Sequence, residues 1–375
     1  MRNQKILLAN QDYTELDNYL VEKKVRKVFL VCIKSIFRLK INAYFVGLEE
    51  RMGIKVISFD EFEPNPTYES VVKGVKIFRQ ERCDMIIAVG GGSAMDVAKC
   101  IKLYADMDPE QSYLEQEIIP NEIKLLAVPT TAGTGSEATR YAVIYYKGEK
   151  QSISDWSCIP EAILIDVSVL KTLPMYQKKS AMLDALCHAI ESFWSVKATP
   201  ESRALSREAL EMILSNMECY LAGDETCNAS MMKAANIAGQ AINITQTTAG
   251  HAMCYKLTSL YGISHGHAAA LCVSRLWPFM LHNMGQCVEP RGEDYLNGIF
   301  RELAQIMGYT DPEMAAGYFR QLVNGMELGV PKAKEEEYKI LVASVNPVRL
   351  GNNPVALAER DMEELYRQIL GQAGG

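Results

Sequence analysis

Short apolar runs rich in β-branched residues alternate with amphipathic stretches through the first 165 residues. Lys27–Cys32, Ile54–Phe59 and Met85–Val89 have the composition of buried strands, and Tyr68–Arg82 has the apolar spacing of a helix. Three further strands are expected at 125–128, 142–146 and 162–165. Strands that alternate with helices are typical of a parallel sheet covered by helices on both faces. The pattern therefore predicts an α/β fold for the first part of the chain.

The pattern changes near Leu173-Pro174, after which strand-like runs almost vanish. Stretches with helical spacing follow at 179–196, 200–221, 227–243, 295–307, 312–328 and 354–370. A chain of 375 residues suits two domains. We therefore expect an α/β domain over 1–178 and an all-helical domain over 179–375.

Composition and charge exclude several classes of protein. Lys plus Arg is 39 and Asp plus Glu is 46, so the net charge of −7 gives no broad attraction to nucleic acid or to an anionic membrane. No apolar run approaches the roughly 18 residues of a membrane helix. The first residues, MRNQKILLANQDY, turn polar too early for a signal peptide. Ten Cys without a C-x2-C pair are expected to be reduced thiols of a cytoplasmic protein.

A glycine triplet follows the third predicted strand and precedes a predicted helix. Glycines at 90–92 allow main-chain N–H groups to approach a ligand closely, and Ser93 is expected to cap the helix. A helix N-terminus of this kind favours a phosphate group. The loop lacks the G-x-G-x-x-G spacing of the Rossmann fingerprint, and a simple tight turn is the alternative interpretation.

A second loop, PTTAGTGSE at 129–137, also follows a predicted strand. Its small hydroxyl residues and two glycines suit contact with a ribose or a diphosphate. Ligands of open α/β sheets bind at the carboxyl ends of the strands, where both loops are expected. The alternative is an ordinary surface turn.

Four residues form a candidate ligand set for a divalent metal. Asp184 and His188 are four residues apart, so they share one face of a predicted helix. His251 follows a Thr-Thr-Ala-Gly segment, and His265 lies fourteen residues later. One carboxylate and three imidazoles suit Fe or Zn. Spacing does not show that the three segments meet, and an ordinary helix-face pair remains the alternative for Asp184 and His188.

Several long motifs carry a resemblance to a known family. They are GGGSAMDVAK at 90–99, PTTAGTGSEAT at 129–139, DALCHAIESFWS at 184–195, the spacing of His251 to His265-Gly266, and Asn346-Pro347. On these the chain resembles the iron-containing (group III) alcohol dehydrogenases over nearly its whole length. The resemblance implies a Rossmann-like dinucleotide-binding domain with a parallel sheet, followed by an all-helical metal-binding domain. Dehydroquinate synthase shares this architecture. The family resemblance also implies a homodimer.

The resemblance assigns residues position by position. Asp184, His188, His251 and His265 would hold Fe(II) or Zn(II). The diphosphate of NAD or NADP would lie against Gly91, Gly92, Ser93 and Asp96. Its nicotinamide half would contact Thr130, Thr131 and Thr134.

The segment after His251 departs from the family pattern. Many members have a second His and a Pro where this chain has Tyr255 and Lys256. Tyr255, His267 or bound water would then deliver a proton to the substrate oxygen. Lys256 and Arg140 are candidates for binding an anionic substrate. Solvated charges or structural ion pairs are the alternative interpretation of the two cations.

Three stretches, at 139–141, 190–204 and 247–271, resemble one branch of the family most. That branch is the phosphonoacetaldehyde reductases, or hydroxyethylphosphonate dehydrogenases, which reduce phosphonoacetaldehyde to 2-hydroxyethylphosphonate. A simple primary alcohol or aldehyde dehydrogenase is the alternative within the family. A dehydroquinate-synthase-type lyase and a non-catalytic binding protein on the same scaffold are the alternatives outside it.

Cofactor preference stays open at this point. Family members that favour NAD can carry an Asp where this chain has Ile33. An acid there repels the 2′-phosphate of NADP, so its absence permits NADP without requiring it. Lys34 and Ser35 either bind that phosphate or simply begin the next helix.

Overall fold

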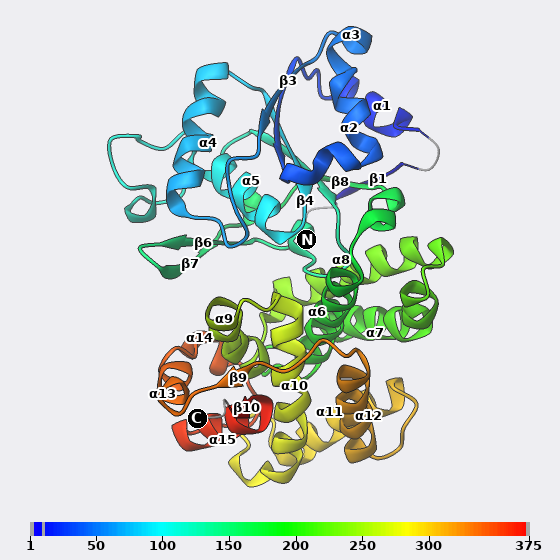
Figure 1. Cartoon of the computed structure of the whole chain (residues 1–375), viewed down its shortest axis with the longest axis vertical. Helices are drawn as coiled ribbons and strands as arrows, with labels where there is room; N and C mark the ends of the chain where they lie inside the picture. The colour runs from blue at the N-terminus through cyan, green and yellow to red at the C-terminus, as the bar shows by residue number, and fades with distance from the viewer. Residues whose placement is uncertain (1–3, 10–11, 373–375) are drawn as a thin grey trace. The chain divides into compact units, whose positions relative to one another are not determined.

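The structure, a computed structural model, describes residues 4–9 and 12–372. Contacts divide it into two units (Figure 1). The α/β unit comprises Met1–Thr131 and Gly135–Leu173, and the helical unit comprises Ala132–Thr134 and Pro174–Gly375. The boundary expected at residue 178 falls inside the first long helix of the helical unit, and it stays a prediction of how the chain divides into domains.

A parallel sheet of six strands forms the centre of the α/β unit. Its order is β1-β8-β5-β4-β2-β3, and every neighbouring pair is parallel. The strands are β1 (Lys5–Leu8), β2 (Lys27–Cys32), β3 (Lys55–Phe59), β4 (Met85–Gly90), β5 (Lys124–Pro129) and β8 (Ala162–Ile165). All six residues of β4 are buried, as expected for a central strand whose two faces are both covered.

Helices flank this sheet on both sides (Figure 1). They are α1 (Thr14–Glu22), α2 (Lys40–Val46), α3 (Leu48–Met52), α4 (Tyr68–Glu81) and α5 (Gly92–Tyr104). The apolar faces of α4 and α5 share a core with the strands, in which the rings of Phe29, Phe59 and Phe78 meet. The predicted α/β class with a parallel sheet is confirmed.

Three details of the α/β unit differ from the predictions. The strand expected at 142–146 forms, as β6 (Tyr141–Tyr146), but it pairs antiparallel with β7 (Glu149–Ser154) outside the main sheet. Lys147 and Gly148 at its turn both have positive φ, 52° and 80°, as the common two-residue hairpin turn requires. Strand β1 was not predicted, because only one of its four residues is buried. The expected cap at Ser93 is wrong: α5 begins at Gly92 and Gly91 is its N-cap.

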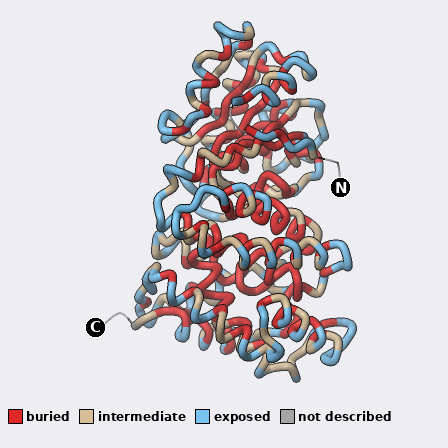
Figure 2. Tube along the Cα trace, turned by 90° about the vertical axis from the view of Figure 1, so that its right-hand side faces the viewer, coloured by how far each residue is buried: buried red, intermediate tan, exposed pale blue. Residues whose placement is uncertain are grey.

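Helix α6 (Met175–Trp194) forms the centre of the helical unit. Every residue from 182 to 194 is buried, because α7, α8, α10 and α11 all pack against it. Figure 2 shows the buried segments running through the interior of the unit. The other helices and strands are α7 (Pro200–Leu221), α8 (Asn228–Thr245), α9 (Ala249–Tyr261), α10 (His265–His282), α11 (Glu293–Ile306), α12 (Pro312–Gly325), α13 (Glu335–Ala343), α14 (Pro347–Leu350), α15 (Glu359–Ile369), β9 (Lys332–Ala333) and β10 (Gly371–Gln372).

The predicted helices of this unit form, with shifted ends, but four helices were not anticipated: the short α13 and α14, and also α9 and α10. Helices α9 and α10 both begin in segments rich in Ala, Gly, Ser and His, which carry little helical periodicity. Helix α15 begins five residues later than expected, at Glu359. Within the described residues, no helix has both the length and the apolar content needed to cross a membrane.

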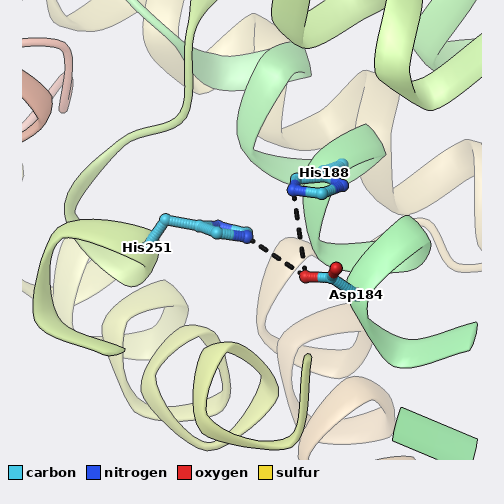
Figure 3. A group of neighbouring side chains, drawn as sticks. All are labelled: Asp184, His188 and His251. Carbon is cyan, nitrogen blue, oxygen red and sulfur yellow. Dashed lines mark hydrogen bonds and ion pairs between the residues drawn. The ribbon is translucent and has the colours of Figure 1, made fainter. Parts of the chain in front are cut away.

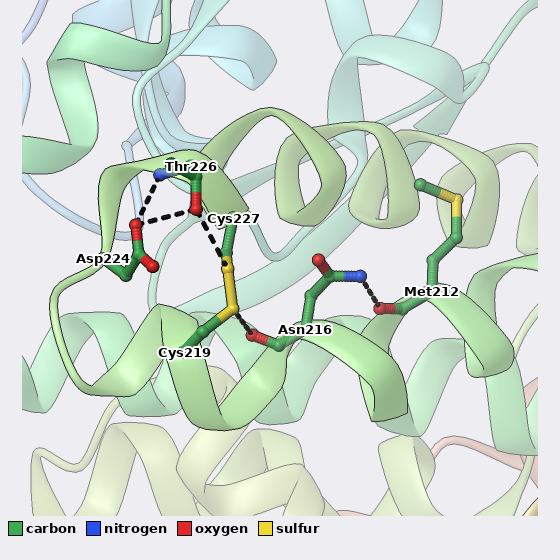
Figure 4. Close-up of a disulfide and its surroundings, with 6 residues drawn as sticks. All are labelled: Met212, Asn216, Cys219, Asp224, Thr226 and Cys227. Carbon is green, nitrogen blue, oxygen red and sulfur yellow. Dashed lines mark hydrogen bonds between the residues drawn. A yellow bond between two sulfur atoms is a disulfide. The ribbon is translucent and has the colours of Figure 1, made fainter.

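One pair of cysteines contradicts the expectation of free thiols. Cys219 near the end of α7 and Cys227 just before α8 form a disulfide (Figure 4). Between them, Asp224 accepts hydrogen bonds from the backbone N–H and the hydroxyl of Thr226, at 2.9 and 2.7 Å. The short connection brings the two cysteines together, which the C-x7-C spacing alone did not indicate. Among the described residues, the other eight cysteines form no disulfide.

Candidate functional site

Helix α6 places Asp184, His188 and Glu191 at positions i, i+4 and i+7, which lie on one helix face. Only 2%, 4% and 0% of these residues is exposed. Polar groups buried to this degree need partners. They find them on two segments that follow much later in the chain.

Those segments are the first turns of α9 and α10. His251 is the third residue of α9, and His265 is the first residue of α10. Gly262, with a φ of 68°, ends α9 and turns the chain back toward α10. Gly266 lets α10 approach α6 closely, since a Cβ there would lie 2.1 Å from the carbonyl oxygen of Ser180. This contact lies one helical turn before Asp184.

The four predicted ligands converge on one carboxylate oxygen. The Oδ1 atom of Asp184 lies 3.4 Å from Nε2 of His251, 3.8 Å from Nε2 of His188 and 4.0 Å from Nε2 of His265. Figure 3 shows the first three residues pointing toward one another. Each of these three offers a ligand atom within 4.8 Å of the others. His265 stands at the margin of the group and is more exposed, with 37% of its side chain accessible.

This donor set fits a divalent metal ion. Three imidazole nitrogens and a carboxylate oxygen that face one another repel unless a proton or a cation lies among them. The ligand types suit Fe or Zn.

Charge within the cluster supports the same interpretation. Burial alone would raise the pKa of Asp184, but the imidazoles of His188, His265 and His251 outweigh it and hold that pKa well below its ordinary value. Burial lowers the pKa of His188 to about 4, so its imidazole is neutral and free to bind a cation. Burial opposes a charge on His251, yet the carboxylates of Glu191 and Asp184 raise its pKa to about 9. A metal ion bound at Nε2 takes the place of that proton.

Tyr255 lies beside this cluster. Its ring stacks on that of His265, with centroids 5.7 Å apart and an interplanar angle of 8°. Burial raises the pKa of Tyr255 to about 12, against the opposing charge of Arg349. The hydroxyl is therefore protonated at neutral pH and can donate a proton. Lys256 follows it on α9 and is half-buried.

His267 has other partners. Its Nε2 atom donates to the carbonyl oxygen of Gly329 at 3.0 Å, and its Nδ1 atom accepts from the hydroxyl of Tyr176 at 3.3 Å. Its backbone N–H donates to the hydroxyl of Ser180 at 3.1 Å. Both ring nitrogens are thus engaged in holding the first turn of α10 against α6 and the loop at 329. This arrangement favours Tyr255 over His267 as the proton donor.

The two glycine loops lie at the carboxyl ends of the adjacent strands β4 and β5. The backbone N–H of Thr130 donates to the carbonyl oxygen of Gly90 at 3.0 Å. The first turn of α5, which contains Gly92 and Ser93, leaves backbone N–H groups without helical partners. A Cβ on Gly91 would meet only Thr131, at 3.6 Å. This loop therefore has the free donors and the open space that a diphosphate needs.

Sequence reasoning missed Lys99, which organises the second loop. Its ammonium is fully buried and donates to the carbonyl oxygens of Ser136, Thr139 and Tyr141 at 2.6, 2.8 and 2.7 Å. Asp96 accepts from the hydroxyl of Ser136 at 3.1 Å. Burial raises the pKa of Asp96 to about 6, despite the charge of Lys99. The signal for Lys99 was a cation in the otherwise apolar stretch Val97–Ile101 of this helix.

Two more of the predicted site residues, Thr134 and Arg140, belong to different units. Thr134 belongs to the helical unit, where its neighbour Gly133 packs on the backbone of Ala181. Arg140 belongs to the α/β unit, and its guanidinium lies 4.3 Å from the ring centroid of Trp156. This cation–π contact is a structural role for Arg140 beside the substrate role expected from the sequence.

The comparisons with known proteins agree with this site. Residues 3–167 match the family described as iron-containing alcohol dehydrogenase, and residues 179–370 match the C-terminal part of the Fe-containing alcohol dehydrogenase family. The phosphonoacetaldehyde reductase of Streptomyces viridochromogenes is 31% identical over 82% of this chain and 80% of that protein. The 1,3-propanediol dehydrogenase of Klebsiella pneumoniae is 34% identical over 92% of this chain and 91% of that protein.

A solved structure shows the same fold. The crystal structure of sulfoacetaldehyde reductase from Bifidobacterium kashiwanohense in complex with NAD+ superposes with a TM-score of 0.86 at 25% identity, over 98% of this chain and 97% of that chain. These relatives are all dehydrogenases or reductases, which favours an oxidoreductase over a lyase or a non-catalytic protein. The chain belongs to the iron-containing alcohol dehydrogenase family.

Proposed function

We propose that this enzyme reduces a short aldehyde that carries a tetrahedral anionic group, with phosphonoacetaldehyde as the substrate and 2-hydroxyethylphosphonate as the product. The observation that carries the proposal is the convergence of Asp184, His188, His251 and His265 beside Tyr255. Two of the relatives are named for acetaldehydes with a phosphonate or a sulfonate group. The presence of Lys256 where many family members have Pro is consistent with such a substrate.

The residues of the helical unit would hold the metal ion and supply the proton. Asp184 with the three imidazoles would bind Fe(II) or Zn(II), which when bound polarises the aldehyde oxygen. Tyr255 donates the proton that the product oxygen needs after hydride has reached the carbonyl carbon. The raised pKa of its hydroxyl keeps the group protonated at neutral pH, so the proton is present to be donated.

The residues of the α/β unit would hold the dinucleotide. The N–H groups at Gly92 and Ser93 would donate to the diphosphate, and Gly91 would leave space for it. Thr130 and Thr131 continue this edge of the sheet. Their hydroxyl groups would fix the nicotinamide half, together with Thr134. NAD or NADP supplies the hydride.

An aldehyde panel tests the substrate. We expect a kcat/KM for phosphonoacetaldehyde, with metal-reconstituted enzyme, about 10- to 150-fold above that for propanal, since a charge-assisted hydrogen bond contributes about 1.5–3 kcal/mol. Sulfoacetaldehyde, 3-hydroxypropanal and both reduced cofactors complete the panel. A preference for 3-hydroxypropanal would instead support the 1,3-propanediol dehydrogenase activity named for the Klebsiella relative.

Lys256→Gln tests the anion-binding role separately. Its kcat/KM should fall about 10- to 100-fold with phosphonoacetaldehyde and stay unchanged with propanal. Lys233→Gln is the matched control, because Lys233 is an exposed lysine on α8 paired with Glu208. Equal losses on both aldehydes would show that Lys256 does not recognise the anion.

A further inference from the structure

We propose that Glu191 is the positioning residue of the metal centre, because its carboxylate fixes the tautomer and the orientation of His251. The inference rests on the proposed function only in that Asp184, His188, His251 and His265 hold the metal. It assigns a role to a residue that touches none of the reacting atoms.

One oxygen of Glu191 faces the ring of His251. Oε2 is hydrogen-bonded to Nδ1 of His251, and no water reaches the pair, since the two residues are 0% and 1% exposed. A carboxylate can only accept, so Nδ1 carries the proton. Nε2, on the far side of the ring, faces Oδ1 of Asp184 at 3.4 Å and is the nitrogen left to bind a metal ion. The wrong tautomer would place a proton where the metal binds.

The other oxygen of Glu191 is held by the start of α9. Oε1 accepts from the backbone N–H of Thr248 at 3.0 Å, from its hydroxyl at 2.6 Å, and from the backbone N–H of His251 at 3.3 Å. Thr248 is the N-cap of α9, so the carboxylate satisfies donors that the helix cannot. The hydroxyl of Thr248 in turn accepts from Nε1 of Trp194 at 3.0 Å. With both oxygens engaged, the carboxylate cannot rotate away from His251.

The packing around Glu191 leaves room for this arrangement and no more. A Cβ on Gly250 would lie 3.0 Å from Oε1 of Glu191 and 2.5 Å from Cγ2 of Val273. Glycine at this position therefore lets the carboxylate reach the first turn of α9. By contrast, His265 has the thiol of Cys254 near its Nδ1, at 3.6 Å. At His251 the corresponding partner of Nδ1 is a carboxylate.

Glu191→Gln tests the inference with a nearly isosteric change. In one orientation the NH2 of the amide faces Nδ1–H of His251. In the other orientation it faces the backbone N–H groups of Thr248 and His251. The first orientation leaves the Nδ1–H tautomer without an acceptor. The second leaves it only a neutral amide oxygen in place of a carboxylate, while donors face one another at the start of α9. We expect Co²⁺ to bind about 10- to 100-fold more weakly, as is typical when the partner of a metal-bound His is lost. The visible d–d absorption of the bound Co²⁺ should also change, because one nitrogen ligand is displaced.

Thr248→Val is the matched control. It removes one hydrogen bond to Glu191 and leaves Nε1 of Trp194 without an acceptor, so it should also lower thermal stability. It retains the contact between Glu191 and Nδ1 of His251. Co²⁺ affinity should therefore stay within about threefold of the wild type, with an unchanged spectrum.

The outcomes separate this inference from the proposed function. If the wild type binds no Co²⁺, the metal centre itself is wrong. If the wild type binds Co²⁺ and Glu191→Gln binds it equally well, only the role of Glu191 is overturned. Equal losses in Thr248→Val and Glu191→Gln would overturn it too, because general loosening would explain both.

A measurement on the wild type covers the case in which Glu191→Gln does not fold. In protein labelled with 15N-histidine and loaded with Zn²⁺, the Nδ1 atom of His251 should carry a slowly exchanging proton. The resonance is assigned by its absence in His251→Gln. A proton on Nε2 of His251 instead would overturn the inference.

Discussion

The close approach of α10 to α6 at Gly266 yields a quantitative prediction. A Cβ built on Gly266 would lie 2.1 Å from the carbonyl oxygen of Ser180, 2.6 Å from Cβ of Asp184 and 3.0 Å from its backbone nitrogen. Ordinary contacts begin at about 3.4 Å. Since two of these atoms belong to the backbone and the third is a Cβ attached directly to it, no rotamer change relieves the clash. The two helices must separate by about 1 Å.

This separation sets the expected cost of Gly266→Ala. Overpacking usually costs about 1–3 kcal/mol, and a gap of 0.5–1 Å forfeits a quarter to a half of each dispersion contact around it. We expect a loss of about 3 kcal/mol, which corresponds to a fall in Tm of about 6–12 °C for a unit of this size. Since His265 precedes Gly266 and the clash falls on Asp184, Co²⁺ affinity should fall as well.

Gly317→Ala on α12 is the matched control, assayed by thermal unfolding and Co²⁺ titration alongside Gly266→Ala. No atom lies within 4 Å of a Cβ at Gly317, and alanine favours a helix over glycine by about 0.5–1 kcal/mol. Its Tm should therefore stay level or rise slightly, with metal affinity unchanged. If Gly266→Ala unfolds no earlier than Gly317→Ala and binds Co²⁺ as the wild type does, the proposed close contact does not exist.

Three further predictions concern other buried groups. Lys99→Met removes the donor from the carbonyl oxygens of Ser136, Thr139 and Tyr141. It should therefore cost about 3–5 kcal/mol of unfolding free energy and weaken NAD binding in calorimetry. Unchanged values would show that the ammonium does not hold this part of the chain. Burial raises the pKa of Asp96 from its ordinary value of 3.8 to about 6 in the folded protein, so the folded state binds the proton more tightly and stability falls as pH rises from about 4 past 6. Relative to wild type, Asp96→Asn should therefore gain about 2 kcal/mol between pH 4 and pH 7 in urea unfolding, and a flat difference would contradict this. Cys219→Ser removes a disulfide whose cysteines are eight residues apart in the sequence. It should lower the free energy of unfolding by about 2 kcal/mol under oxidising conditions but not in dithiothreitol. An equal loss under both conditions would assign the effect to packing.

The features that could be predicted from sequence are those encoded within a few residues. Alternating strands and helices, the two glycine loops and the i, i+4 spacing of Asp184 and His188 all follow from local pattern. The long motifs at these positions also carried the family resemblance. The strand at 142–146 illustrates the limit, because its periodicity indicates a strand but not its partner, and it pairs with β7 in a hairpin.

The candidate site could be predicted only in part, because its decisive contacts are between distant segments. In the sequence, Glu191 is one of several polar residues of a predicted helix. The role proposed for it depends on its burial against the first turn of α9. From the sequence, His267 is a second candidate for the proton donor. In the structure, its two ring nitrogens are hydrogen-bonded to the hydroxyl of Tyr176 and the carbonyl oxygen of Gly329. The disulfide between Cys219 and Cys227 likewise depends on how α7 connects to α8.

By itself, the order of amino acids determined which elements form, which loops can receive a phosphate and which side chains could bind a metal. Only tertiary packing decided that His251 and His265 reach Asp184, because residues 67 and 81 positions later in the chain meet it solely where α9 and α10 lie against α6. The physical reason is that backbone preferences act over one or two turns, whereas this meeting depends on glycines at 250 and 266 that admit close approach and on a buried carboxylate that must find its donors.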